Sequence, residues 1–274
     1  MAQLPARPEI SNLVLRAISA AALLPLAVAM VWLGGWMFAI FLGLLGAAMA
    51  SELAAMSRAA SGLRAALIAV AALTPLIFLY AGPQVAAAAV GLGAVLVAIL
   101  AAASRKSDVP LLVGAFGYVS CAMVAVLWLR HAPEAGFFTL LWIFAIVVAT
   151  DVGAYFAGQS IGGPKLAPRI SPSKTWSGLI GGIVCAGFAG WGVLSLAGEA
   201  GSFWTLVFGG LLAVVAQCGD LLESALKRHF GVKDAGSLIP GHGGVLDRLD
   251  GFLSVAPVVA LVTWGLSGGP LKWV

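Results

Sequence analysis

Four acidic residues near the C-terminal end of the chain are spaced so that they could bind a cation. Asp220 and Glu223 are three residues apart, as are Asp247 and Asp250, so each pair falls on one face of a helix. Both pairs adjoin long apolar stretches, where a carboxylate costs several kcal/mol unless it is paired or bound to a cation. Hard oxygen ligands of this type suit Mg²⁺, which completes its shell with water and substrate phosphates. We therefore predict that all four residues bind a metal ion; the alternative is local ion pairing, such as Glu223 with Lys227 four residues on.

Two connections between apolar stretches carry most of the other residues that could bind a phosphate. They are 158–176, preceded by Asp151 and Tyr155, and 227–250, which contains a glycine-rich turn at 239–244. Ammonium and guanidinium groups bind phosphate oxygens, and glycines let backbone N–H groups approach an anion closely. The Gly, Pro and Ser content of the first connection argues against a regular helix there. A plain tight turn at 239–244, or a helix start after 171–175, would produce a similar pattern.

The remainder of the chain has the composition of a membrane protein that holds these residues in place. Of its 274 residues, 61% are hydrophobic and only 9% are charged, whereas a soluble domain carries roughly 25% charged residues. This composition excludes a soluble globule, a disordered chain and a disulfide scaffold. Cys121, Cys185 and Cys218 lie within apolar runs, and we expect them to be small buried hydrophobes.

Nine apolar stretches reach the length needed to span a membrane. They are 12–33, 35–56, 63–81, 83–103, 110–130, 136–157, 177–197, 203–226 and 251–267. We therefore predict an all-α, polytopic integral membrane bundle of about nine transmembrane helices.

The basic residues indicate how this bundle is oriented. If the N-terminus lies inside, only Arg130 and Lys272 of the 15 Lys and Arg residues fall on outer segments. We therefore expect a cytoplasmic N-terminus, with both polar connections on the cytoplasmic side of the plasma (inner) membrane. A basic inner face beside anionic lipid headgroups accounts for the net charge of +4, so no nucleic-acid partner is expected.

The motifs of the C-terminal half resemble those of a known family. Residues 219–250, with Pro-Gly-His-Gly-Gly-Val-Leu-Asp-Arg-Leu-Asp at 240–250, look like the signature of the phosphatidate cytidylyltransferases, or CDP-diacylglycerol synthases. Segments 151–158, 165–168 and 171–178 fit the same family, although Gly163 stands where a basic residue is frequent and Ser177 where Glu or Gln is frequent. The N-terminal stretches match the family only in being hydrophobic. We therefore divide the chain into a scaffold, 1–110, and a catalytic part, 111–274.

The resemblance implies transfer of CMP from CTP to phosphatidic acid, giving CDP-diacylglycerol and pyrophosphate, with Mg²⁺ required and a second, monovalent cation as an option. It implies that Asp220, Asp247 and Asp250 act with Lys227 and Arg228 as catalytic residues. It also implies substrate contacts by Asp151, Tyr155, Lys165, Ser171, Lys174, Thr175, Ser224, Lys233, His242, Gly243, Gly244 and Arg248. The expected partners are CTP, phosphatidic acid and membrane lipids, and the family indicates a homodimer.

Two other classes of protein remain as alternatives. A related membrane nucleotidyl- or phosphotransferase acting on another lipid phosphate would keep the same acidic and basic residues, and only its substrates would distinguish it. An ion-coupled transporter also places carboxylates at membrane depth, but it predicts two halves with related patterns. Here the polar motifs are confined to one half, so the transporter is the less favoured alternative.

Overall fold

The computed structural model describes residues 9–106, 108–132, 135–198, 202–239 and 243–266. Over this part of the chain, nine helices and one two-stranded hairpin follow one another. The helices are α1 (Glu9–Leu33), α2 (Gly35–Met56), α3 (Ser61–Ala81), α4 (Pro83–Ala103), α5 (Val109–Arg130), α6 (Gly136–Ile161), α7 (Trp176–Leu196), α8 (Phe203–His229) and α9 (Leu246–Gly265). The strands are β1 (Lys165–Ala167) and β2 (Ser171–Thr175), between α6 and α7.

Seven of the helices, α2 to α8, are long and apolar enough to cross a membrane. The described residues of α1 add a shorter apolar segment, Ala21–Leu33. Helix α9 starts with the charged residues Asp247, Arg248 and Asp250, and its apolar part follows them. The chain is therefore an integral membrane protein, and the predicted all-α polytopic bundle is confirmed.

Three of the helices that carry predicted site residues extend beyond the predicted apolar stretches into polar sequence. Helix α6 continues to Ile161 instead of ending at 157, α8 continues to His229 instead of 226, and α9 begins at Leu246 instead of 251. The predicted limits follow hydropathy, whereas a helix continues as long as its N–H groups find the carbonyl four residues back. The added turns place Lys227, Asp247 and Asp250 on helices rather than in a loop.

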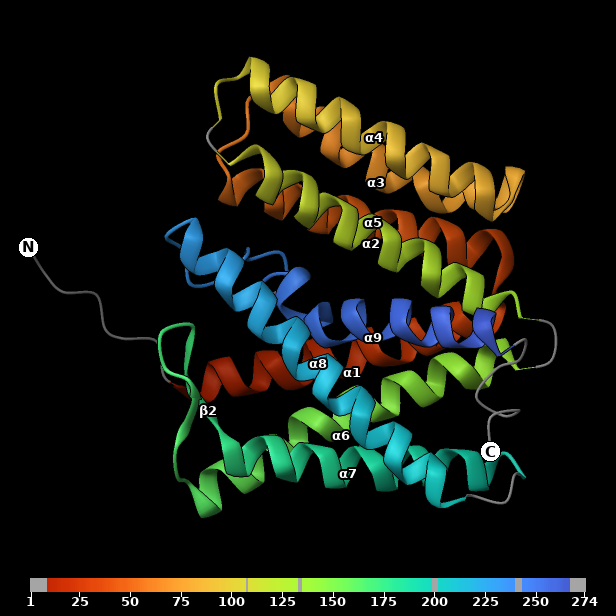
Figure 1. The fold of residues 1–274 in the computed structure, drawn as a ribbon, viewed down its shortest axis with the longest axis vertical. Coiled ribbons are helices and arrows are strands. Elements are labelled where there is room, and N and C mark those ends of the chain that lie inside the picture. Colours follow the sequence, from red (N-terminus) through yellow and green to blue (C-terminus); the bar gives the residue numbers. More distant parts are fainter. Residues whose placement is uncertain (1–8, 107, 133–134, 199–201, 240–242, 267–274) are drawn as a thin grey trace, which may run out of the picture.

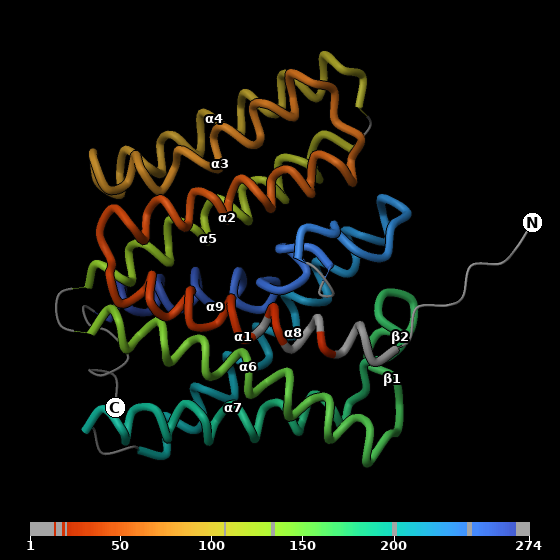
Figure 2. The backbone as a smooth tube through the Cα atoms, turned by 180° about the vertical axis from the view of Figure 1, so that it is seen from behind, coloured from red at the N-terminus to blue at the C-terminus, as the bar shows by residue number. Residues whose placement is uncertain are grey.

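The helices lie side by side in layers (Figure 1). Helices α3 and α4 form one edge, α2 and α5 pack next to them, α9, α8 and α6 follow, and α7 closes the opposite edge. The view from behind in Figure 2 shows the same order. The chain reverses at each connection, so the α2–α3 turn, the β1–β2 hairpin and the start of α9 lie at one end of the bundle, which we call the hairpin end.

The outer surface of the bundle is apolar, and this corrects the expectation for the cysteines. Cys121, Cys185 and Cys218 are free and exposed on α5, α7 and α8 instead of being buried. Large hydrophobic side chains such as Leu92 on α4 and Phe188 on α7 are exposed in the same way. Lipid tails are as apolar as these side chains, so a membrane helix does not have to bury such residues against protein.

Helices α6 and α7 approach each other closely through glycine. A Cβ atom added at Gly153 would lie 2.7 Å from the backbone oxygen of Gly181, and one at Gly181 would lie 2.8 Å from the oxygen of Gly153. The two backbones are therefore in contact, as is typical of membrane helices. This contact holds α6, which carries Asp151 and Tyr155, against α7.

The connection between α6 and α7 is a hairpin, whereas the sequence predicted only that it would not be a regular helix. Strands β1 and β2 are antiparallel, with Lys165 opposite Thr175 and Ala167 opposite Ser171, and the register is irregular between these pairs. Thr175 ends β2 and caps α7, because its hydroxyl accepts a hydrogen bond from the Gly178 N–H at 3.1 Å. The alternative of a helix start after 171–175 is therefore confirmed.

Candidate active site

A polar cavity of about 480 Å³ lies at the hairpin end, between β2 and the helices α6, α7 and α8. Its lining includes six of the predicted site residues: Asp151, Tyr155, Ser171, Lys174, Thr175 and Asp220. Lys174 connects the hairpin to α8, because its Nζ forms an ion pair with Asp220 and donates a hydrogen bond to Gln217 Oε1 at 2.6 Å. The fold thus brings two motif segments that are distant in sequence to one cavity.

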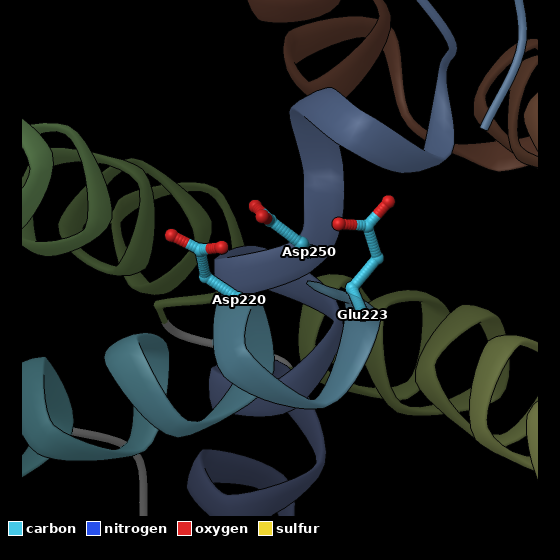
Figure 3. Close-up of side chains that lie close together, drawn as sticks. All are labelled: Asp220, Glu223 and Asp250. Atoms are coloured by element: carbon cyan, nitrogen blue, oxygen red, sulfur yellow. The ribbon is translucent and has the colours of Figure 1, made fainter. Parts of the chain in front are cut away.

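Three carboxylates converge where α8 meets α9 (Figure 3). Asp220 and Glu223 come from α8 and Asp250 comes from α9, and one oxygen of each lies within 4.8 Å of the others. Asp220 accepts a hydrogen bond from Ser224 Oγ at 3.3 Å, and Asp250 accepts one from the Gly251 N–H at 2.7 Å. Clustered carboxylate oxygens are the donor set that Mg²⁺ prefers, and a divalent cation would offset their mutual repulsion. These residues therefore fit a magnesium site.

Gly219 allows α8 and α9 to approach each other at this point. A Cβ atom added there would overlap Ser254 Oγ and would lie 2.7 Å from the backbone oxygen of Asp250. The crossing is also held by a hydrogen bond of 3.1 Å from Ser254 Oγ to the Val215 carbonyl. A larger residue at 219 would therefore push α9 away and change the spacing between Asp220 and Asp250.

Asp247 lies outside this group of three and is held by other donors. Its carboxylate accepts hydrogen bonds from Lys227 Nζ at 2.7 Å, from the Ala235 N–H at 3.0 Å and from the Gly244 N–H at 2.9 Å. Burial by itself raises the pKa of Asp247, which precedes the apolar part of α9, but its hydrogen bonds, first of all the one from Lys227, together with the charge of Lys227 outweigh burial and lower this pKa below its ordinary value. Asp247 would have to exchange one of these donors to bind a cation, and its metal role stays a prediction.

Lys227 joins Asp247 to the carboxylate group. Its Nζ lies 2.7 Å from Glu223 Oε2 as well as 2.7 Å from Asp247 Oδ1, and all three side chains are largely buried. The local pair of Glu223 with Lys227, which the spacing offered as the alternative to metal binding, is therefore present. It coexists with the carboxylate group, because Glu223 belongs to both.

The other predicted substrate residues are spread around the hairpin end. Arg228 Nε donates to the Ile170 carbonyl at 3.4 Å and so connects the end of α8 to the hairpin turn. Gly243 has φ +85° and pairs with Ile239 through two backbone hydrogen bonds. His242 lies outside the described residues. Six charged or aromatic residues of the predicted site are exposed: Asp151, Tyr155, Lys165, Arg228, Lys233 and Arg248.

Backbone N–H groups at the end of the glycine-rich turn and at the start of α9 donate to acidic side chains of the protein itself. The N–H of Gly244 donates to Asp247, and those of Val245 and Leu246 donate to the two oxygens of Glu52 at 2.8 and 2.9 Å. Within the described residues of the turn, the Gly244 N–H binds a carboxylate of the same chain and the Gly243 N–H bonds to the Ile239 carbonyl, so binding of a substrate anion by this turn stays a prediction.

Three residues near the site were not predicted from the sequence. They are Glu52, which holds the start of α9; Gln217, which accepts from Lys174; and Tyr118, whose hydroxyl donates to the Asp250 carbonyl at 2.9 Å. A lone carboxylate inside an apolar stretch is a signal that could have identified Glu52. The spacing of Gln217, three residues before Asp220, could have identified the second, and nothing in the sequence marks Tyr118.

A second cavity, of about 530 Å³, lies on a different face of α8 and is lined mostly by apolar side chains of α5 and α8. Leu111, Tyr118, Leu222 and Leu226 contribute to it, and Glu223 lies in its wall. Glu223 also belongs to the group of three carboxylates, so the apolar cavity adjoins the acidic site.

The fold and the cavities together define a polytopic membrane protein whose acidic and basic site residues, over the described part of the chain, lie at one end of the bundle. Comparison with known families adds to this description: a model described as the cytidylyltransferase family matches residues 14–265. The chain belongs to this family.

Relatives with assigned functions agree with the family. A protein named phosphatidate cytidylyltransferase from Brucella suis biovar 1 (strain 1330) is 39% identical over 251 residues, which is 92% of this chain and 93% of the relative. Proteins of the same name from Haemophilus influenzae and Staphylococcus aureus (strain COL) are 42% identical over 132 residues and 41% identical over 151 residues. These two alignments cover 46% and 54% of this chain, and 46% and 58% of the relatives.

Proposed function

We propose that this chain transfers CMP from CTP to phosphatidic acid, giving CDP-diacylglycerol and pyrophosphate. The observation that carries the proposal is the meeting of both motif segments at one polar cavity, in a chain whose relatives are named phosphatidate cytidylyltransferases. The apolar cavity beside Glu223 supports a lipid substrate, because an acyl chain needs an apolar path to an acidic and basic site.

The reaction brings two polyanions together. An oxygen of the phosphatidic acid phosphate attacks the α-phosphorus of CTP, a new P–O bond forms, and the bond from the α-phosphorus to the bridging oxygen breaks. That oxygen leaves with the electron pair as part of pyrophosphate. The attacking oxygen is already largely ionised at neutral pH, so no side chain has to remove a proton. The protein contributes positioning and neutralisation of charge.

The cationic side chains at the hairpin end supply this neutralisation. Lys174 lies in the wall of the polar cavity, and its ion pair with Asp220 keeps the ammonium group oriented toward α8. Arg228 and Arg248 are exposed near the same end, where they would neutralise the triphosphate or the departing pyrophosphate. Ser171, also in the cavity wall, offers a hydroxyl group to a phosphate or a sugar, and the buried Thr175 holds the start of α7 beside it.

Asp220, Glu223 and Asp250 are the residues that would hold Mg²⁺, with Asp247 predicted as a further ligand. When bound, Mg²⁺ would neutralise phosphate charge and polarise the α-phosphorus. Lys227 orients Glu223 by its ion pair, and Gly219 sets the separation of α8 and α9, so these two residues shape the acidic site. A second, monovalent cation stays a prediction.

The position of the protein in the cell is part of the same proposal. The excess of Lys and Arg on one set of connections supports a hairpin end that faces the cytoplasm, where CTP is available, in the plasma (inner) membrane. Phosphatidic acid would then enter from the bilayer, and CTP from water. We also propose a homodimer, for which the small residues of the membrane helices allow close packing.

The experiment that tests the proposal uses purified protein in mixed micelles with phosphatidic acid and labelled CTP, with and without Mg²⁺. We expect Mg²⁺-dependent formation of labelled CDP-diacylglycerol, its loss in Asp220→Asn, and its retention in Asp108→Asn, which removes a carboxylate that pairs with His229 outside the polar cavity. A panel of other lipid phosphates accompanies phosphatidic acid. Turnover of another lipid phosphate in its place, or near-normal activity of Asp220→Asn, would refute the proposal.

A further inference from the structure

Helix α2, in the part of the chain predicted to be scaffold, carries a carboxylate that reaches the catalytic part. Glu52 is 3% exposed, and its two oxygens accept hydrogen bonds from the backbone N–H groups of Val245 and Leu246. These amides lie 193 and 194 residues further along the chain, at the start of α9. Glu52 therefore joins the N-terminal helices to the helix that carries Asp250.

The start of α9 needs such a partner. The first N–H groups of a helix have no acceptor within the helix, and they carry partial positive charge. Val245 precedes the first turn, and no side-chain hydrogen bond caps the helix from that position. The Glu52 carboxylate supplies the missing acceptors. The hydrogen bonds from these amides in turn offset the cost of burying the carboxylate, which amounts to several kcal/mol when it is unpaired.

The connection before α9 is shaped around this carboxylate. A Cβ atom added at Gly236 would lie 2.6 Å from Glu52 Oε1, and one added at Gly244 would lie 2.9 Å from both Glu52 oxygens. The two glycines thus allow the backbone to enclose Glu52 from two positions. Gly244 belongs to the glycine-rich turn of the family signature. The absence of a side chain at this position is therefore explained by the Glu52 carboxylate that lies against it.

The contact is connected to the acidic site within one helical turn. Leu246, which donates to Glu52, is followed directly by Asp247, and Asp247 holds Lys227, which pairs with Glu223. Asp250 follows one turn later on the same helix, where it joins Asp220 and Glu223. A shift or rotation of the start of α9 would therefore move every carboxylate of α9 relative to those of α8.

We propose that Glu52 is a positioning residue for the acidic site: it fixes the start of α9 and thereby the placement of Asp247 and Asp250 against α8. The inference rests on the proposed function for its kinetic consequence, but not for the contact itself. Glu52 does not touch substrate, and its effect is transmitted through the backbone of α9.

The test compares Glu52→Gln with Ser51→Ala, a neighbouring control whose hydroxyl bonds only within α2, to the Ala48 carbonyl. Glutamine keeps the shape but turns an NH₂ group toward one of the two amide donors, so one hydrogen bond and the charge are lost. We expect kcat to fall by about tenfold or more and the Mg²⁺ concentration for half-maximal activity to rise severalfold, with little change in the KM for CTP. Glu52→Asp, which keeps the charge, should recover part of the loss.

Hydrogen–deuterium exchange of the Val245 and Leu246 amides gives a readout that is independent of catalysis, and we expect faster exchange in Glu52→Gln only. Unchanged kcat and Mg²⁺ dependence in this variant, with or without faster exchange, would overturn the inference. If Glu52→Gln does not fold, Gly236→Ala serves as the test variant, because its methyl group would push the Glu52 carboxylate out of place without removing it. Wild-type kinetics in Gly236→Ala would also overturn the inference. Inactive wild-type protein would instead refute the proposed function, and the exchange measurement would still report whether Glu52 holds α9.

Discussion

Replacing Lys227 by Met tests how the acidic site is held together. Lys227 Nζ lies 2.7 Å from a carboxylate oxygen of both Glu223 and Asp247, and the exposed fractions of the three side chains are 13%, 2% and 8%. Met fills most of the space of the Lys side chain but leaves two buried carboxylates without their shared cation. Removing one partner of a buried ion pair costs about 3–5 kcal/mol, and we expect the free energy of unfolding to fall by this amount.

A loss of this size corresponds to a decrease in Tm of about 10 °C, given about 2–4 °C per kcal/mol for chains of this size class. Thermal unfolding in detergent would measure it, with Lys233→Met as the control, because Lys233 is exposed in the connection after α8. The double variant Lys227→Met with Glu223→Gln should recover more than half of the lost stability. Asp247 would then keep its backbone donors Ala235 and Gly244, and the carboxylate repulsion would be gone.

Two outcomes would refute this reasoning. If Lys227→Met unfolds at the wild-type temperature, the ion pairs contribute nothing to stability, and Lys227 acts only on substrate. If the double variant is no more stable than Lys227→Met, the loss comes from packing of the Lys side chain and not from uncompensated charge.

Three further predictions concern the helix crossing, the hairpin and its cap. Gly219→Ala should abolish most CTP-dependent activity while Gly192→Ala, at a position with open space around its Cβ, should retain it, as the micelle assay would measure. Lys174→Met should raise the KM for CTP by about tenfold or more and leave the fold intact, as steady-state kinetics and size-exclusion chromatography would check. Thr175→Ala should remove the cap of α7 and lower the free energy of unfolding by about 1 kcal/mol, measured by unfolding in detergent, whereas Thr175→Ser should keep it.

Hydropathy was sufficient to predict the bundle and most of its helices, because membrane spans require long apolar runs. It was not sufficient at the helix ends, where α8 and α9 continue through Lys227 and Asp247. Backbone hydrogen bonding continues through polar residues, and hydropathy contains no information about it. The hairpin was missed for a related reason, since pairing of Lys165 with Thr175 depends on a turn and on docking against α7 rather than on alternation in the sequence.

The motif residues were predicted as a set, but their pairings were not. Spacing placed Asp220 with Glu223 and Asp247 with Asp250, whereas the structure groups Asp220, Glu223 and Asp250. Asp247 instead accepts hydrogen bonds from Lys227 and from the backbone amides of Ala235 and Gly244. Spacing along a helix reports which residues share a face, but the angle at which α9 crosses α8 decides which carboxylate reaches which partner.

The contact between Glu52 and the start of α9 also has a consequence for how the protein is made. During synthesis α2 is complete long before α9 exists, and the 193 residues that separate Glu52 from Val245 take about 10 to 40 s to translate at about 5–20 residues per second. Over that interval the Val245 and Leu246 amides are not yet available to Glu52, and an unpaired carboxylate inside a membrane helix carries an insertion cost of up to about 3 kcal/mol. Helix α9 therefore stabilises α2, which is synthesised long before it, and a nascent chain truncated before α9 would retain a carboxylate in α2 without the Val245 and Leu246 amides.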